Sequence, residues 1–99
     1  MKVVFAPLAK QALEQIGDFI AQDNPRRAFS FVRELREKAR SLARSPRAFP
    51  LIPHYEARGI RRRIHGQYLI LYRVETDAIV ILHILHGAQD IDRALFPDS

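Results

Sequence analysis

Two apolar runs near the C-terminus, separated by a short polar gap, limit the possible folds more than any other feature of this sequence. The first is QYLILYRV at residues 67–74, and the second is AIVILHILH at residues 78–86. Runs of this length, rich in β-branched and aromatic residues, are typical of β-strands. A turn at Thr76-Asp77 predicts an antiparallel hairpin. Both runs are mostly apolar, which predicts a sheet covered on one face by helices and partly covered on the other.

Apolar residues recur at helical spacing in the N-terminal half of the chain. Residues 2–6 (KVVFA) predict a short strand, and Pro7 fits the first turn of a helix that follows it. Asn24-Pro25 predicts the cap and first residue of a second helix, which runs to about Arg44. The connection between these helices is short, so they are expected to pack as an antiparallel hairpin.

The remaining segments complete the predicted topology. Residues 45–59 contain three prolines and no consistent period, which predicts a loop laid across the surface. GIRRRI at residues 59–64 predicts a third strand for the C-terminal sheet. The polar tail 91–99, with Leu95-Phe96 as an apolar anchor, allows either a helical turn or a mobile end, and its polarity favours mobility.

The predicted fold class is α+β. An N-terminal strand and an antiparallel helical hairpin pack on a mainly antiparallel sheet, which three C-terminal strands complete (β-α-α-β-β-β). The length of 99 residues predicts one domain over residues 1–99.

Composition narrows the class of protein. The 47% hydrophobic and 27% charged fractions are typical of a folded soluble protein, and the absence of cysteine excludes disulfides and thiolate metal sites. The N-terminal apolar run is too short for a signal peptide, and no run approaches the ~20 residues of a membrane span. A soluble protein of the cytoplasm is expected.

Basic residues are concentrated in the middle of the chain. Residues 24–63 carry twelve Lys/Arg against three Asp/Glu, within a net charge of +5. Most of the basic residues are arginines, which suit bidentate pairing with carboxylate or phosphate. This distribution predicts an anionic partner, either nucleic acid or an acidic protein segment.

The hairpin centred on Thr76-Asp77 predicts which side chains share a face. Arg73 and His86 fall on one face and His83 on the other, because alternate residues of a strand point to opposite sides. His83 and His86 therefore cannot bind one metal ion together. No catalytic triad, phosphate loop or carboxylate pair is recognisable, so we expect no metal, no cofactor and no catalytic residues.

Arg61-Arg62-Arg63 is the second unusual feature. In a strand, Arg61 and Arg63 share one face, and Arg62 lies on the other. Two interpretations remain open. Charges on an edge strand prevent edge-to-edge aggregation. Alternatively, these arginines form a cationic rim beside Arg58 and Arg73 that binds phosphate or carboxylate.

Three stretches of the sequence resemble a known family. Residues 59–90 (GIRRRIHGQYLILYRVETDAIVILHILHGAQD), residues 6–28 (APLAKQALEQIGDFIAQDNPRRA) and LARSP at residues 42–46 resemble the ParE branch of the ParE/RelE toxin superfamily. The resemblance covers nearly the whole chain in order. Two positions depart from the branch's habitual pattern: His83 and Gln89 each stand where arginine is common.

The resemblance implies a toxin of a type II toxin–antitoxin pair. Its partner would be a ParD-like antitoxin whose acidic, extended C-terminal segment wraps the toxin in a hetero-oligomer. Its target would be DNA gyrase, and it would contact DNA only indirectly, through the antitoxin. The superfamily's other branch cleaves mRNA on the ribosome, and it carries a basic residue where this chain has Leu69. Ribosome-dependent RNase activity and a non-toxic co-repressor role are the alternatives.

The resemblance also suggests two sets of site residues. The expected antitoxin-binding residues are Leu13, Ile16, Ile20, Arg33, Arg36 and Arg40. The expected target-binding residues are Arg58, Arg61, Arg63, Arg73, His86 and Asp90.

Overall fold

The computed structural model describes residues 1–87 and 89–96, so position 88 and the end of the predicted tail, 97–99, lie outside the described residues. In chain order the elements are β1 (Lys2–Phe5), α1 (Pro7–Ala21), α2 (Pro25–Ser41), β2 (Ile60–His65), β3 (Tyr68–Val74), β4 (Ala78–His86) and α3 (Ile91–Leu95). Two short 3-10 helices, η1 (Leu42–Arg44) and η2 (Glu56–Arg58), lie between α2 and β2. The predicted order is confirmed, with α3 added at its end.

The four strands form one sheet in the order β1-β4-β3-β2. β1 runs parallel to β4, and the other neighbours are antiparallel. The chain leaves the sheet after β1 through the helical hairpin and returns at β2, on the opposite edge. Two antiparallel pairings, β2 with β3 and β3 with β4, then bring β4 beside β1 in the same direction. The predicted α+β class with a mainly antiparallel sheet is confirmed.

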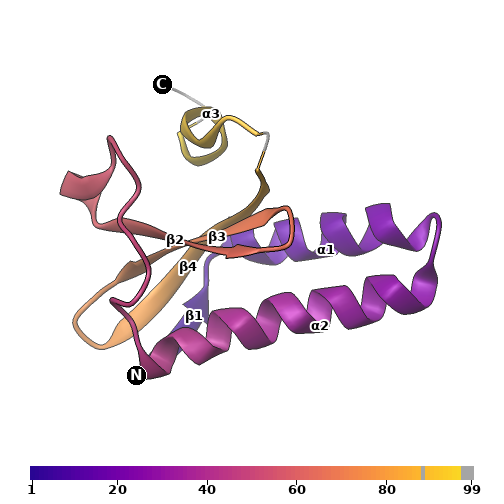
Figure 1. Cartoon of the computed structure of the whole chain (residues 1–99), viewed down its shortest axis with the longest axis horizontal. Helices are drawn as coiled ribbons and strands as arrows, with labels where there is room; N and C mark the ends of the chain where they lie inside the picture. Colours follow the sequence, from indigo (N-terminus) through magenta and orange to yellow (C-terminus); the bar gives the residue numbers. More distant parts are fainter. Residues whose placement is uncertain (88, 97–99) are drawn as a thin grey trace.

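The helical hairpin covers one face of the sheet, on the side away from α3 in Figure 1. Asn24 accepts a hydrogen bond from the backbone N–H of Arg27 and so caps α2, as its position before Pro25 predicts. Leu35 of α2 and Tyr72 of β3 are fully buried between the layers. We call this the helix face of the sheet.

The opposite face, which we call the back face, has a smaller core. Ile52, Ile60, Leu71 and Leu85 are buried there, and α3 packs over them on the far side of the sheet from the hairpin (Figure 1). The prediction of a loop merely laid across the surface is therefore incomplete for residues 45–59. Ile52 enters the core, and its backbone N–H donates to the carbonyl of Ile60, which extends the sheet beyond β2.

The described part of the tail forms a helical turn, which is the first of the two predicted alternatives. The carboxylate of Asp90 accepts hydrogen bonds from the backbone N–H groups of Asp92 and Arg93, which caps α3 at its start. Leu95, half of the predicted anchor, packs against the back-face core. The expected mobility gives way to a short helix because the back face offers apolar surface to cover.

The final hairpin follows the predicted register near its turn. Arg73 pairs with Val80, and Tyr72 pairs with Ile81. Tyr72 and Ile81 are fully buried on the helix face. The position of the turn is thus confirmed.

A β-bulge then shifts the register by one residue, between Leu71 and Tyr72 on β3. Beyond it Tyr68 pairs with His86, whereas the prediction paired Tyr68 with Leu85. A one-residue shift moves side chains to the other face, so Leu85 joins the back-face core and His86 lies beside Tyr68 on the helix face. The predicted faces are wrong for this half of β4.

Candidate functional site

A groove lies between the outer surfaces of α1 and α2. It encloses about 460 Å³ and is lined by Leu13, Glu14, Gly17, Asp18, Ala28, Phe29, Val32, Arg33 and Arg36. The helices approach closely here, since a Cβ added at Gly17 would lie 3.3 Å from Cγ2 of Val32. The absence of a side chain at this position therefore allows the two helices to pack this closely.

An aromatic ring and arginines form the rim of this groove. The side chain of Phe29 is 72% exposed, and the guanidinium carbon of Arg33 lies 5.8 Å from its ring centroid. An exposed ring beside a cation offers both apolar area and a site for an acidic group. Such a surface fits an amphipathic segment with carboxylates along one side.

A second hollow continues the groove towards β1. It encloses about 270 Å³ between Phe5, Lys10 and the arginines Arg36 and Arg40. The guanidinium carbon of Arg40 lies 5.7 Å from the ring centroid of Phe5. Leu13, Glu14 and Arg36 line both hollows. We call this continuous surface the basic groove.

The predicted antitoxin-binding residues divide by depth. Arg33, Arg36 and Arg40 are exposed and line the basic groove. Leu13 is only 3% exposed at its floor, and Ile16 is buried in the helix-face core, with Ile20 packed against it. The arginines are therefore accessible at the groove, as is Phe29, which the prediction omitted.

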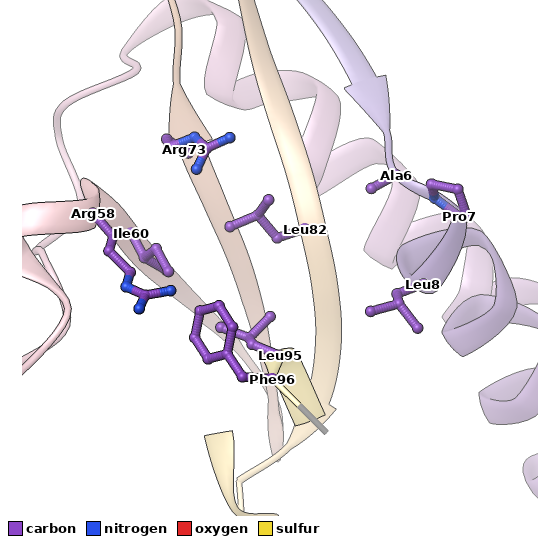
Figure 2. A pocket seen from close by; sticks show the side chains of 9 residues that line it. All are labelled: Ala6, Pro7, Leu8, Arg58, Ile60, Arg73, Leu82, Leu95 and Phe96. Atoms are coloured by element: carbon purple, nitrogen blue, oxygen red, sulfur yellow. The ribbon is translucent and has the colours of Figure 1, made fainter. Parts of the chain in front are cut away.

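A different pocket lies on the back face (Figure 2). It encloses about 330 Å³ and is lined by Ala6, Pro7, Leu8, Arg58, Ile60, Arg73, Leu82, Leu95 and Phe96. We call it the back-face pocket. Two of the predicted target-binding residues, Arg58 and Arg73, stand at its wall, and the rest of the lining is apolar.

Both arginines of the back-face pocket have partners. The guanidinium carbon of Arg58 lies 4.2 Å from the ring centroid of Phe96. Arg73 donates two hydrogen bonds to Oε2 of Glu75, from Nε at 3.1 Å and from Nη2 at 2.8 Å. These contacts hold the two cations in place while each keeps further N–H groups for a ligand.

Arg61 and Arg63 lie on the helix face of β2, away from the back-face pocket. Nη1 of Arg61 donates to the carbonyl of Phe49 at 2.7 Å. Nη1 of Arg63 donates to the carbonyl of Lys38 at 3.2 Å and to Oγ of Ser41 at 2.7 Å. Lys38 and Ser41 belong to the last turn of α2, where cations are favoured.

The cationic rim, the second of the two interpretations of Arg61-Arg62-Arg63, therefore does not form beside Arg58 and Arg73. β2 pairs Arg61 with Tyr72, a helix-face residue, but pairs Ile60 with Arg73 on the back face. Alternation along β2 thus sends Arg61 towards the end of α2, while Arg73 faces the back-face pocket. Tyr72 lies on the same face of the sheet as Arg61. The Tyr72 hydroxyl donates to the carbonyl of Pro46, and burial raises the pKa of this hydroxyl.

His83 and His86 line one cavity of about 170 Å³ between α1 and β4. His83 pairs with Leu71 of the back face and His86 with Tyr68 of the helix face, so the predicted alternation is kept and the bulge exchanges the two predicted faces. The ring of His86 contacts Tyr68 edge to face at 5.4 Å, and its Nε2 lies 3.1 Å from Oε1 of Gln67. Burial lowers the pKa of His83, whose Nδ1 accepts a hydrogen bond from the backbone N–H of Ile84.

The predicted target-binding residues accordingly lie in three places. Arg58 and Arg73 face the back-face pocket, Arg61 and Arg63 bind the end of α2, and His86 lies under α1. Asp90 caps α3. Arg73 and His86 are on opposite faces of the sheet, so they do not converge on one reacting group.

Two exposed phenylalanines were missed by the sequence reasoning. Phe29 and Phe19 are 72% and 68% exposed, although most phenylalanines are buried. Their signal was present in the sequence, because each falls outside the apolar stripe of its helix. The ring of Phe29 gains significance from its place in the lining of the basic groove, where it adds apolar area to that surface.

The described residues contain neither a cluster of metal ligands nor a helix that could span a membrane. Across residues 1–87 and 89–96, no three histidine, cysteine or acidic side chains are grouped so that they could hold a metal ion. In the same part of the chain, no helix has the length and apolarity needed to cross a membrane.

The fold and its surfaces define a small two-layer α+β protein with a basic groove on its helical side. The sequence model of a family described as the ParE toxin of the type II toxin–antitoxin system parDE matches residues 3–91. The chain therefore belongs to the ParE toxin family, within the ParE/RelE superfamily. A search of curated protein sequences found no match.

Two solved structures resemble this chain. One is from the chromosomal ParDE system of P. aeruginosa, with a TM-score of 0.74 and 22% identity over 87% of this chain and 95% of that one. The other is from the toxin–antitoxin complex RelBE2 of Mycobacterium tuberculosis, with a TM-score of 0.63 and 26% identity over 86% of this chain and 95% of that one. Both branches of the superfamily thus share the fold.

Proposed function

We propose that this toxin inhibits DNA gyrase in the cytoplasm and is neutralised by a ParD-like antitoxin that binds the basic groove. Membership of the ParE family supports the gyrase target. Both similar structures come from toxin–antitoxin systems, which supports a protein partner of this class. The observation that carries the proposal is the basic groove itself.

The basic groove has the chemistry that an acidic antitoxin segment requires. Phe29 offers an apolar anchor point, and Arg33, Arg36 and Arg40 form a cationic rim. A segment that folds on binding would gain most of its affinity from buried apolar groups. The arginines would speed association and set its register.

We also propose that the chain acts by binding rather than by cleaving a bond. Acid–base catalysis of RNA cleavage needs proton-transfer and cationic groups that meet at one phosphate. Arg73 and His86 lie on opposite faces of the sheet, and Arg61 and Arg63 are occupied at the end of α2. This separation supports a role in macromolecular binding.

One experiment tests the proposal. Purified toxin is added to gyrase and supercoiled plasmid, and cleaved DNA–gyrase complexes are counted with and without the antitoxin encoded by the neighbouring reading frame. We expect cleaved complexes to accumulate and an equimolar amount of antitoxin to prevent them. Trimmed mRNA on ribosomes with intact gyrase activity would contradict the gyrase target. Normal growth during expression without antitoxin would contradict toxicity and favour a co-repressor role.

A further inference from the structure

Acidic residues are almost absent from the middle of the chain. Between residues 38 and 74, Glu56 is the only one, against nine lysines and arginines. Part of this excess belongs to the basic groove and to the back-face pocket. Among residues 38–74, all of which the structure describes, three exposed cations belong to neither surface: Lys38, Arg44 and Arg47. We call these three residues the basic end.

Folding brings the basic end together. Lys38 lies in the last turn of α2, Arg44 ends η1, and Arg47 follows in the next loop. Nη1 of Arg63 donates to the carbonyl of Lys38 at 3.2 Å, and Nη1 of Arg61 donates to that of Arg47 at 3.4 Å. Since Arg61 and Arg63 share one face of β2, they hold these two backbone segments side by side and add their own charge.

The loop that carries Arg47 is fixed from inside the protein. The hydroxyl of the buried Tyr72 donates to the carbonyl of Pro46 at 2.8 Å. The backbone N–H of Arg62 donates to the carbonyl of Pro50 at 3.1 Å. These loop carbonyls are therefore bonded to the sheet, while the side chain of Arg47 is exposed. A backbone that is already ordered lowers the entropy cost of binding at this surface.

The cations of the basic end are not neutralised by a neighbouring acid. Across the residues that the structure describes, no carboxylate lies within salt-bridge distance of any of the three. By contrast, Arg27 pairs with Glu34, and Arg73 pairs with Glu75. The positive charge of the basic end is therefore available to an anionic partner.

The surroundings of the basic end disfavour several kinds of anionic partner. The structure describes all of residues 38–58, and none of their phenylalanine, tyrosine or large aliphatic side chains is exposed. A protein partner draws its affinity from buried apolar anchors, and a membrane surface needs apolar side chains that insert. Single-stranded nucleic acid needs exposed rings on which its bases stack. Cations alone suffice for the phosphate backbone of a duplex.

We propose that the basic end binds the phosphate backbone of double-stranded DNA without sequence preference. The choice of DNA rests on the proposed function, because gyrase holds duplex DNA and a toxin bound to gyrase would lie near it. This direct contact differs from the expectation that the chain meets DNA only through the antitoxin. The basic groove remains free for the antitoxin, since the basic end shares no residue with it.

Fluorescence anisotropy of a labelled DNA duplex of about two helical turns, titrated with the full-length toxin, tests the proposal. Each phosphate contact contributes roughly 0.9 to the salt dependence, so three contacts predict that log affinity falls against log salt with a slope of about −2.7. Affinity that does not change with salt would overturn the proposal. So would tighter binding to duplex RNA, to single-stranded DNA or to vesicles of anionic lipid than to the DNA duplex.

Two variants with equal changes in net charge localise the contact. Arg44→Gln with Arg47→Gln removes two cations from the basic end. Arg26→Gln with Arg93→Gln removes two exposed cations from the start of α2 and from α3. We expect the first variant to bind the duplex roughly tenfold more weakly at about 0.1 M salt, with a slope smaller by about 1.8, and the second to change little. Equal losses would assign the binding to net charge and overturn this surface.

Thermal unfolding controls for the fold of both variants. All four substituted side chains are exposed, so both variants should unfold at the wild-type temperature. Antitoxin binding should also be unchanged in the Arg44→Gln, Arg47→Gln variant, because neither residue lines the basic groove.

A gyrase assay separates this proposal from the proposed function. We expect the Arg44→Gln, Arg47→Gln variant to need about tenfold more toxin than the wild type to accumulate the same amount of cleaved DNA–gyrase complex. If both proteins poison gyrase at equal concentrations and neither binds the duplex, the DNA contact is refuted and the proposed function stands. If the toxin binds the duplex as expected and no cleaved complex forms, the gyrase target is refuted and the DNA contact stands.

Discussion

The arginines of β2 and those of α2 have the same side chain and opposite roles. Arg61 and Arg63 point inward and donate to the carbonyls of Phe49 and Lys38. Arg33 and Arg36 point outward and line the basic groove. A guanidinium with carbonyl acceptors within reach stabilises the fold, whereas one without them remains available to a partner.

Packing against aromatic rings occurs in both groups and so does not separate them. Arg63 lies 4.6 Å from the ring centroid of Phe49, and Arg33 lies 5.8 Å from that of Phe29. The two groups differ in whether the aromatic ring is packed against the core or exposed. Phe49 packs against the helix-face core, while Phe29 is exposed. The same pair of residue types therefore serves as an internal contact in one place and as a binding surface in the other.

The largest expected effect comes from reversing the outward arginines. The triple variant Arg33→Glu, Arg36→Glu and Arg40→Glu should weaken antitoxin binding by about a hundredfold and flatten its salt dependence, because three attractions become repulsions. Its thermal unfolding should change little, since these side chains are exposed. Titration calorimetry at several salt concentrations measures the first effect.

A control with the same change in net charge makes this test specific. Arg26, Arg44 and Arg47 are exposed and outside the basic groove, so reversing them should have a far smaller effect on binding. Unchanged affinity and salt dependence in the groove variant would remove the basic groove from the antitoxin interface.

A smaller effect is expected from an inward arginine. Arg63→Met should lower the free energy of unfolding by about 2 kcal/mol, because it removes charged hydrogen bonds to Lys38 and Ser41. Arg62→Met is the matched change on the same strand, at a side chain with no hydrogen bond to the described residues. Chemical denaturation measures both. Equal losses would break the distinction between inward and outward arginines.

The smallest effect is expected at Glu34, whose carboxylate pairs with Arg27 of the same helix. The hydrogen bond from Arg27, and then that from His65, hold the pKa of Glu34 below its ordinary value. A lowered carboxyl pKa stabilises the fold above the unfolded-state pKa, and this contribution is lost as pH falls through the folded-state pKa. Stability should therefore decline as the pH falls below the ordinary carboxyl pKa of 4.5 and through the lowered folded-state pKa, and less steeply in Glu34→Gln. Identical unfolding midpoints across that range would contradict this role for Glu34.

Much of the fold was predictable because its signals are local. Asn24-Pro25 marks the start of α2, and the observed helix begins at Pro25. The predicted strand at residues 78–86 matches β4, Ala78–His86. Apolar spacing, caps and turn residues act over a few positions, so they can be read from neighbouring residues.

The candidate sites were less predictable, because they depend on contacts between distant segments. Nothing in the sequence around Leu82 or His83 signals a bulge, yet the bulge separates His86 from Arg73. Likewise, the carbonyls that bind Arg61 and Arg63 come from residues 12 to 25 positions earlier. Periodicity gave the alternation along β2 but not the segment that each arginine would face.

The amino-acid sequence by itself determined the order of helices and strands, the position of the final turn and the excess of arginine in the middle of the chain. Tertiary structure alone decided which arginines are occupied and which face carries His86. The physical reason is how far apart along the chain the interacting residues are. Propensity and capping depend on residues a few positions apart, whereas hydrogen-bond satisfaction and strand pairing depend on the atoms that folding brings within about 3 Å.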